Sequence, residues 1–164
     1  MIEVPLSKGK FAIVDDEDYD LFSGAVHAFC TDGIWYAVKS AHSGSNVYPH
    51  RQILERILGR SLNRAEHADH KNGDSLDNRR ANIRLATSTE NQRNRRKQRT
   101  FCGRPTSSIY KGVKFMPKEK RWHATIYIAR KPVFLGSYVN EIDAAYAYDK
   151  AACERFGDFA RTNF

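Results

Sequence analysis

The chain is poor in cysteine and has no long apolar run. Its three cysteines, Cys30, Cys102 and Cys153, lie far apart, and no C-x-x-C pair is present. Because disulfide frameworks and zinc knuckles need paired or closely spaced cysteines, neither is expected. No stretch of about 18 apolar residues could span a bilayer, and the N-terminus lacks the apolar region of a signal peptide. These absences predict an intracellular protein that does not bind a membrane.

Acidic residues are scarce in the middle of the chain. Over all 164 residues, 27 Lys and Arg exceed 19 Asp and Glu, which leaves a net charge of +8. Residues 51–131 hold 21 basic and 7 acidic residues, whereas residues 1–50 hold 3 and 7, and residues 132–164 hold 3 and 5. Positive charge concentrated in this way favours a polyanionic partner such as nucleic acid.

The N-terminal residues 1–48 predict a small antiparallel unit, with strands at the apolar run 11–14 and at the aromatic and β-branched run 34–38. The acidic residues 15–18 have no companion histidine, so a solvated turn is expected there rather than a metal site. Apolar residues at 53, 54, 57 and 58 mark one face of a helix, with Pro49 in its first turn and Gly59 as its stop.

Residues 67–96 carry the clearest chemical signal. Asp69 and His70 are followed by Asn82 and Asn91, and arginines cluster behind them. Carboxylate and amide oxygens are ligands that Mg²⁺ accepts, and a nearby imidazole can remove a proton from water. The arginines suggest that the substrate is a phosphodiester.

The local structure of this stretch is also predictable. The side-chain amide of Asn82 can tie the loop to itself, and Thr87 or Ser88 can cap the helix with Glu90 or Asn91 in its first turn. The expected elements are a strand at 66–70, a loop at 71–81, a strand at 83–86 and a helix at 88–96.

This pattern resembles the HNH homing endonucleases common in phages, whose site is a β-β-α unit around one divalent metal. The resemblance implies that Asp69 and Asn91 hold one Mg²⁺ or Mn²⁺, that His70 is the general base, and that Asn82 fixes the loop and the orientation of His70. It also implies double-stranded DNA as the substrate, no small-molecule cofactor, and the cytoplasm of a bacterial host as the location. Similar Tyr-x-His-Arg segments precede the motif in many of these proteins, so His50 either supports the site or only anchors the structure.

One geometric condition applies to the predicted site. Adjacent residues on a regular strand point to opposite faces. Asp69 and His70 can therefore share a site only if the strand ends or twists at that point.

Residues 93–99 hold five cations in seven positions. Such runs are often solvated faces or linkers. Here the run lies between the nuclease motif and a spacer at 100–108, so we expect it to lie along a duplex and neutralise phosphates. The expected DNA contacts are Arg93, Arg95, Arg96, Lys97 and Arg99.

The last segment carries a second resemblance. Tyr-Lys-Gly-Val at 110–113, Trp-His-Ala at 122–124, Phe-Leu-Gly-Ser-Tyr at 134–138, Ala-Ala-Tyr-Ala-Tyr-Asp at 144–149 and the final Asn-Phe look like the plant ethylene-response-factor (APETALA-type) DNA-binding domain. This resemblance implies a three-stranded antiparallel sheet packed on one helix, with the sheet face in the major groove. Residue types agree, since they favour strands at 110–115, 122–129 and 133–138 and a helix at 141–155.

Basic and aromatic residues at matching positions of this segment are the DNA-contact candidates. They are Lys111, Lys114, Lys118, Arg121, Trp122 and Lys131. Met116, Tyr127, Pro132 and Phe134 stand where plant members usually carry arginine or tryptophan, so base specificity cannot be transferred. Trp122 and Phe134 are equally consistent with core positions.

The sequence thus predicts an α+β protein with four parts: residues 1–62 as a β-rich unit with a helix, 63–99 as the nuclease motif, 100–108 as a linker and 109–164 as the DNA-binding domain. The expected function is metal-dependent hydrolysis of DNA, with a monomer nicking one strand. The alternatives are a DNA-binding regulator whose nuclease unit is vestigial, and a structural or RNA-binding module. The last is disfavoured because single-strand readers usually display base-stacking aromatic residues.

Overall fold

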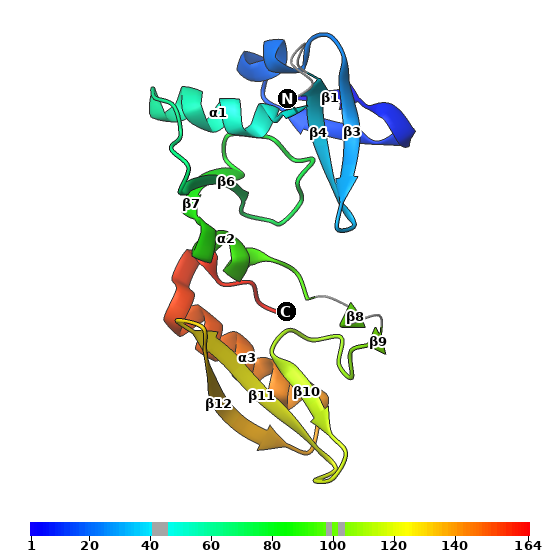
Figure 1. Cartoon of the computed structure of the whole chain (residues 1–164), viewed down its shortest axis with the longest axis vertical. Helices are drawn as coiled ribbons and strands as arrows, with labels where there is room; N and C mark the ends of the chain where they lie inside the picture. The colour runs from blue at the N-terminus through cyan, green and yellow to red at the C-terminus, as the bar shows by residue number, and fades with distance from the viewer. Residues whose placement is uncertain (41–45, 98–99, 102–103) are drawn as a thin grey trace. The chain divides into compact units, whose positions relative to one another are not determined.

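A computed structural model of the chain describes all residues except 41–45, 98–99 and 102–103. The described residues form two compact units, Met1–Asn91 and Gln92–Phe164. Both combine small antiparallel sheets with helices, which is consistent with the expected α+β class (Figure 1). No helix in the described part of the chain is long and apolar enough to cross a membrane.

The first unit begins with two small sheets. Strands β1 (Ile2–Pro5) and β2 (Phe11–Val14) pair in antiparallel fashion, and β3 (Val26–Thr31), β4 (Ile34–Ser40) and β5 (Asn46–Val47) form a second sheet in that order. Short 3-10 helices, η1 (Ser7–Gly9) and η2 (Asp16–Phe22), lie between these strands. The strands expected at 11–14 and 34–38 are therefore present.

Helix α1 (Pro49–Leu58) follows, with Pro49 in its first turn. It ends at Gly59, whose φ of 66° is the left-handed conformation that favours glycine at a helix C-terminus. Both boundaries are those that the sequence predicts. The helix contacts η2, β4, β6 and β7, so it lies at the centre of the first unit.

The predicted nuclease motif is a β-hairpin followed by a helix. Strand β6 (Glu66–His70) pairs with β7 (Ile83–Thr87), and α2 (Ser88–Asn94) begins at the next residue. The predicted strands agree within one residue, and the helix ends two residues earlier than predicted. Residues 71–82 form the loop between the two strands, also as expected.

One hydrophobic core joins these elements. It includes residues from the N-terminal strands, from α1 and from β7, so residues 1–62 and the hairpin bury their apolar side chains together. The boundary expected at residue 62 lies inside this unit. The buried members are Val4, Ala12, Val14, Phe22, Ala37, Ile53, Leu54, Leu62 and Ile83.

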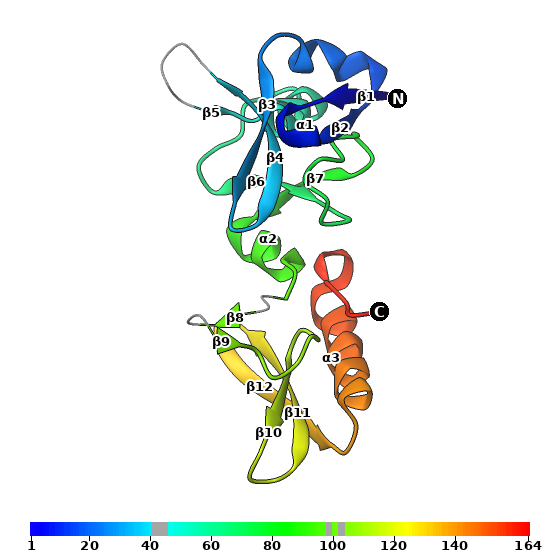
Figure 2. The same ribbon diagram turned by 90° about the vertical axis from the view of Figure 1, so that its right-hand side faces the viewer.

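The second unit contains a short hairpin, β8 (Thr100–Phe101) with β9 (Arg104–Pro105), and a three-stranded antiparallel sheet. The sheet consists of β10 (Val113–Met116), β11 (Arg121–Ile128) and β12 (Lys131–Tyr138), with β11 in the centre. Helix α3 (Glu141–Phe156) covers one face of the sheet and is followed by η3 (Gly157–Phe159) (Figure 2).

Small residues allow α3 to lie close to the sheet. Ala144 and Ala145 are fully buried against Val113 and Ala124. At Gly112, which has φ 76°, a Cβ atom would lie 1.9 Å from Cδ2 of Tyr148, so only glycine fits there. Because this positive φ is not that of an extended strand, β10 begins only at Val113, three residues later than the sequence predicts.

The C-terminal residues are fixed to the rest of this unit. The Asn163 side chain accepts a hydrogen bond from the Lys111 amide at 2.6 Å and donates one to Asp149 Oδ1 at 2.8 Å. Asp149 also accepts from the backbone amides of Asn163 and Phe164. The chain end therefore belongs to the folded unit.

Candidate nuclease site and nucleic-acid interface

His70 is the last residue of β6 and is only 6% exposed. Its ring lies 4.9 Å from the ring of His50, and its Nε2 lies 3.2 Å from Oδ1 of Asn78. Burial lowers the pKa of His70, although the Asn78 hydrogen bond and the nearby Asp69 carboxylate oppose this shift. The imidazole is therefore neutral near pH 7, the form in which it can accept a proton.

Asn78 determines which nitrogen of His70 carries the proton. The Asn78 Nδ2 group donates to the Leu76 carbonyl at 3.1 Å, so its Oδ1 must be the atom that faces His70. An amide oxygen only accepts, and the His70 Nε2 therefore donates to it. In a neutral imidazole with Nε2 protonated, Nδ1 carries the lone pair.

The N-terminal strands hold the loop that carries Asn78, itself only 1% exposed. The Asn78 amide donates to the Ile13 carbonyl at 2.7 Å, and the Ile13 amide donates to the Leu76 carbonyl at 2.9 Å. The Ser75 hydroxyl donates to the Trp35 carbonyl on β4. Contacts from β2 and β4 thus fix the position of the loop beside His70.

Asn82 ties the loop to itself. Its Oδ1 accepts from the Asn72 amide at 3.0 Å, and its Nδ2 donates to the Asp77 carbonyl at 2.7 Å. The side chain is 7% exposed. Asp77 directly precedes Asn78, so the hydrogen bond from Asn82 to Asp77 also restrains Asn78, the partner of His70.

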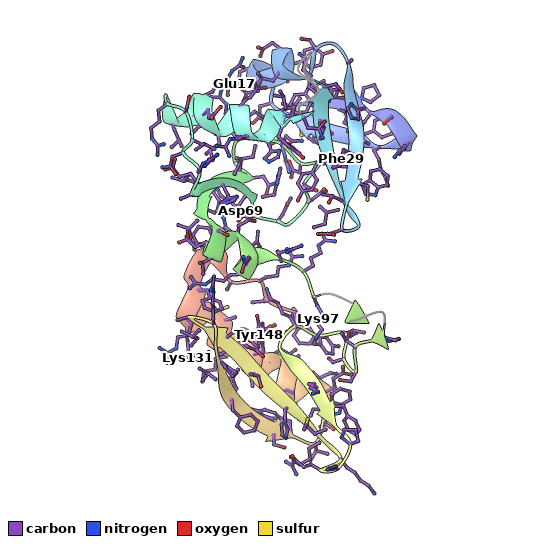
Figure 3. All side chains as sticks on the ribbon, viewed as in Figure 1. Glu17, Phe29, Asp69, Lys97, Lys131 and Tyr148 are labelled. Carbon is purple, nitrogen blue, oxygen red and sulfur yellow. The ribbon has the colours of Figure 1, made fainter. Side chains whose placement is uncertain are left out.

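Asp69 is 4% exposed and pairs across the hairpin with Arg84. The Arg84 Nε and Nη2 atoms lie 2.8 and 2.7 Å from Oδ2 of Asp69. Figure 3 shows Asp69 on the hairpin next to β7. Strand β6 ends at His70. The condition that the strand end at the Asp69–His70 pair is therefore met. The two neighbours make different contacts, Asp69 with Arg84 and His70 with His50 and Asn78.

Asn91 comes from α2, whose start is set by a capping box. The Glu90 amide donates to Thr87 Oγ1 at 3.3 Å, and the Thr87 amide donates to the Glu90 carboxylate at 2.7 Å. Thr87, rather than Ser88, is therefore the capping residue. Asn91 follows in the first turn and is half-buried.

His50 lies in an aromatic cluster beside the candidate base. Its ring centroid is 5.9 Å from that of Tyr36 and 5.6 Å from that of Tyr48, in addition to its contact with His70. Burial, with smaller contributions from the charges of His70 and Arg51, lowers the pKa of His50 to about 3. His50 is thus an uncharged ring that packs on His70.

The acidic segment at 15–18 is not simply a solvated turn, which corrects the expectation from sequence. Asp18 is fully buried and accepts hydrogen bonds from Arg80 at 2.6 Å and from Arg56 at 3.2 Å. Burial alone raises the pKa of Asp18, but the bonds from these arginines outweigh it and the pKa lies below its usual value. Asp18 links η2, α1 and the nuclease loop.

Within the described residues, no three His, Cys, Asp or Glu side chains gather at a position that could hold a metal ion. The donors predicted from sequence are one carboxylate and one amide, Asp69 and Asn91. A hard cation held by so few protein ligands takes its other ligands from water and substrate phosphates.

The basic candidates of the second unit divide into two groups. Lys111 donates to the carbonyls of Arg93 and Arg95, the latter at 2.8 Å, and burial together with the charge of Arg161 lowers the pKa of Lys111 to about 8. The Arg93 guanidinium lies 4.4 Å from the centre of the Phe156 ring. These two cations hold residues 93–95 against the rest of the unit.

The other candidates are mostly at the surface. Trp122 is an exception, since it packs against the core with its ring 4.9 Å from that of Phe115. Lys97 is half-buried, which lowers its pKa, and Arg99 lies outside the described residues. The exposed cations are Arg95, Arg96, Lys114, Lys118, Arg121 and Lys131.

Residues 47–93 match a family model described as HNH endonuclease. This segment is less than a third of the chain and contains α1, the hairpin and most of α2. It includes Asp69, His70, Asn82 and Asn91. The match indicates a nuclease, and it implies DNA binding.

Short matches to plant proteins provide a second comparison. An AP2/ERF and B3 domain-containing protein of Oryza sativa subsp. japonica is 48% identical over 58 residues, which are 35% of this chain and 16% of the plant protein. APETALA2-like protein 2 of Oryza sativa subsp. indica is 41% identical over 61 residues, 37% of this chain and 14% of that protein. The AP2-like ethylene-responsive transcription factor TOE2 of Arabidopsis thaliana is also 41% identical over 61 residues, 37% of this chain and 13% of its own length. The chain therefore spans only about a seventh of these relatives.

The roles of three residues of this region were not identified from the sequence. Asn78 and Asp18 are buried, Arg84 is partly buried, and all three have defined partners. The antiparallel pairing of the two predicted strands could have placed Arg84 opposite Asp69. No local pattern marks Asn78 or Asp18, because their partners are brought near only by the fold.

Proposed function

We propose that this protein is a metal-dependent endonuclease that hydrolyses phosphodiester bonds of double-stranded DNA, with His70 as the general base. The observation that carries the proposal is the held, neutral imidazole of His70 at the end of β6, next to the carboxylate of Asp69. The HNH endonuclease match over 47–93 supports the same reaction class. The further assignment to homing endonucleases of phages rests on the resemblance of the motif.

The roles of the site residues follow from their contacts. His70 would take a proton from water at Nδ1, because Nε2 donates to Asn78, and the hydroxide formed would attack the phosphorus as the bond to the 3′ oxygen breaks. Asp69 and the Asn91 amide oxygen would hold one Mg²⁺ or Mn²⁺. Such an ion, when bound, would supply positive charge to balance the scissile phosphate and the leaving oxygen. Asn82 keeps the loop closed around His70.

DNA binding is proposed to come from the basic residues outside the hairpin. The exposed Arg95, Arg96, Lys114, Arg121 and Lys131 would contact phosphates, whereas Lys111 and Arg93 would keep the segment at 93–95 in position. Each chain has one His70, so a monomer should cut one strand in each binding event.

A second function is favoured by one observation. The positive charge of Arg84 already balances the negative charge of the Asp69 carboxylate. In an inactive protein this ion pair could take the structural place of a bound metal ion. The protein would then be a DNA-binding regulator with an inactive nuclease unit, in keeping with the names of the matched plant proteins.

Cleavage of supercoiled plasmid separates the two functions. With Mg²⁺ or Mn²⁺ the chain should convert supercoiled plasmid to open circles, with linear DNA appearing late, and EDTA should stop the reaction. The products are measured on an agarose gel over time. Binding without any metal-dependent cleavage would favour the regulator, and immediate linear product together with a dimer in light scattering would contradict nicking by a monomer.

Asn78→Ala should reduce the cleavage rate by about 10–100-fold with little change in DNA affinity, because the partner that orients the base is lost. The contact itself can be observed by NMR. The wild type should show a slowly exchanging imidazole proton on Nε2 of His70, assigned by its loss in His70→Gln. The signal should disappear in Asn78→Ala and remain in Asn78→Asp, which keeps an oxygen facing the ring.

Asn72→Ala is the matched control, since the Asn72 side chain stabilises the same loop by donating to Asp77 and accepting from the Asp74 amide. It should leave the Nε2 proton signal in place. If Asn72→Ala removes the signal as Asn78→Ala does, general loosening of the loop explains the effect. If the wild-type proton is on Nδ1, the assigned role of Asn78 is wrong.

A further inference from the structure

One face of the sheet in the second unit is covered by α3, and the strand register defines the residues on the other face. Val113 pairs with Ala124, and both are buried under the helix, as is Ile126. Side chains alternate along a strand, so the intervening residues point away from α3. They are Lys114, Met116, Arg121, His123, Thr125 and Tyr127, with Phe134 opposite Thr125. We call this set the open sheet face.

Two large apolar rings on the open sheet face are exposed. Tyr127 is 66% exposed and Phe134 is 60% exposed. Phe134 contacts His123 edge-on, with 5.0 Å between the ring centroids, and it is the diagonal neighbour of Tyr127 across the strand pair. The two rings therefore form a patch on one surface, although both side chains contribute little to the core beneath.

The charge around this patch identifies its partner. Residues 113–138 hold the six basic residues Lys114, Lys118, Lys120, Arg121, Arg130 and Lys131 and one acidic residue, Glu119. On α3 the balance is reversed, with four acidic and two basic residues. A polyanion is thus attracted to the sheet and not to the helix. The basic surroundings favour duplex DNA over an apolar protein surface.

Duplex DNA offers one apolar group that such rings could contact. The major groove is wide enough for a β-ribbon, and the C5-methyl group of thymine is the apolar feature that base edges present there. Phosphates would be met by Lys114 and Arg121 on the same face and by Lys131 at the start of β12. Polar readout of guanine or adenine requires donors or acceptors that phenylalanine lacks.

We propose that Tyr127 and Phe134 read thymine through its methyl group, so that the open sheet face selects thymine-containing sites. The inference rests on the proposed function for its partner, duplex DNA. It assigns base selection to two apolar rings that the resemblance to the plant domain left without a role.

The test compares two short duplexes, one of alternating adenine and thymine and one in which deoxyuridine replaces every thymine. This replacement removes the methyl group and keeps the base pairing. Binding of the full chain is measured by fluorescence anisotropy with EDTA present and at low salt. The wild type should bind the thymine duplex about 4-fold more tightly for one buried methyl group and about 10-fold or more for two.

Phe134→Ala should reduce the thymine preference several-fold, and the double substitution with Tyr127→Ala should abolish it. Affinity for the uracil duplex should stay near the wild-type value in both variants. Since both rings are largely exposed, these substitutions leave the fold intact, which circular dichroism checks. Phe11→Ala is the matched control, because Phe11 is similarly exposed, at 55%, but lies in the first unit. It should keep the full preference.

Equal affinity of the wild type for the two duplexes would overturn the inference, as would a preference that survives the double substitution or one that Phe11→Ala also removes. Failure to bind either duplex at low salt would overturn it too. These outcomes are independent of cleavage, since EDTA is present. A protein that prefers thymine but never cuts DNA would contradict only the proposed nuclease activity.

Discussion

Replacement of His70 by alanine should lower the rate of plasmid nicking by about 10²–10⁴-fold, because a general base typically contributes this much to a reaction. DNA affinity should change little, since His70 is uncharged and only 6% exposed. The rate is measured under single-turnover conditions with Mg²⁺, and affinity is measured separately with EDTA. A lower nicking rate at unchanged DNA affinity is expected if His70 is a general base. A residue that binds DNA would instead change the affinity.

His67→Ala is the matched control for this substitution. His67 lies three residues earlier on the same strand and pairs with Ala86 on β7. It should retain nicking activity within a few-fold of the wild type. If His70→Ala still nicks DNA at nearly the wild-type rate, another group supplies the base and the assignment is wrong.

Asp18→Asn should lower the free energy of unfolding of the first unit by about 3 kcal/mol, near the lower end of the range for breaking a buried ion pair. The change keeps the shape of the side chain but removes the charge that Arg80 and Arg56 meet. The lower end is expected because the arginine side chains are 32% and 38% exposed and water can partly replace the carboxylate.

Each unit contains one tryptophan, Trp35 in β4 and Trp122 in β11, so fluorescence can follow the first unit alone. Urea unfolding is measured in a Trp122→Phe background. Asp20→Asn is the control, since Asp20 also pairs with Arg56 but is 63% exposed, and its effect should be much smaller. Equal effects at the two positions would mean that burial of Asp18 is unimportant.

The pH dependence provides an additional check. The pKa of Asp18 is lowered in the folded state, so its stabilising contribution is present above the pKa of the unfolded chain, about 3.9, and is lost as pH falls through the lower folded value. The wild type and Asp18→Asn should therefore differ most near neutral pH and approach each other in acid.

The local elements were predictable to within a few residues because their signals are local. Pro49 and Gly59 bound α1 through their own backbone preferences, and Thr87 with Glu90 starts α2 through contacts only three residues apart. The hairpin of β6 and β7 and the sheet and helix of the second unit follow from residue type in the same way. The late start of β10 was missed, because residue type alone did not show that Gly112, with φ 76°, lies in a turn.

The sequence by itself determined the reaction class to be tested, since Asp69, His70, Asn82 and Asn91 stand close together in the chain at a recognisable spacing. Only the tertiary structure decided how His70 is held. The backbone amide of Asn78 bonds the carbonyl of Ile13, which lies 65 residues earlier in the chain. The Asp18 carboxylate bonds Arg80, which lies 62 residues later. Backbone hydrogen bonds do not depend on residue type, and ion pairs between distant segments leave no periodic pattern. Such contacts exist only after the apolar side chains of β1, β2, α1 and β7 have been buried in one core.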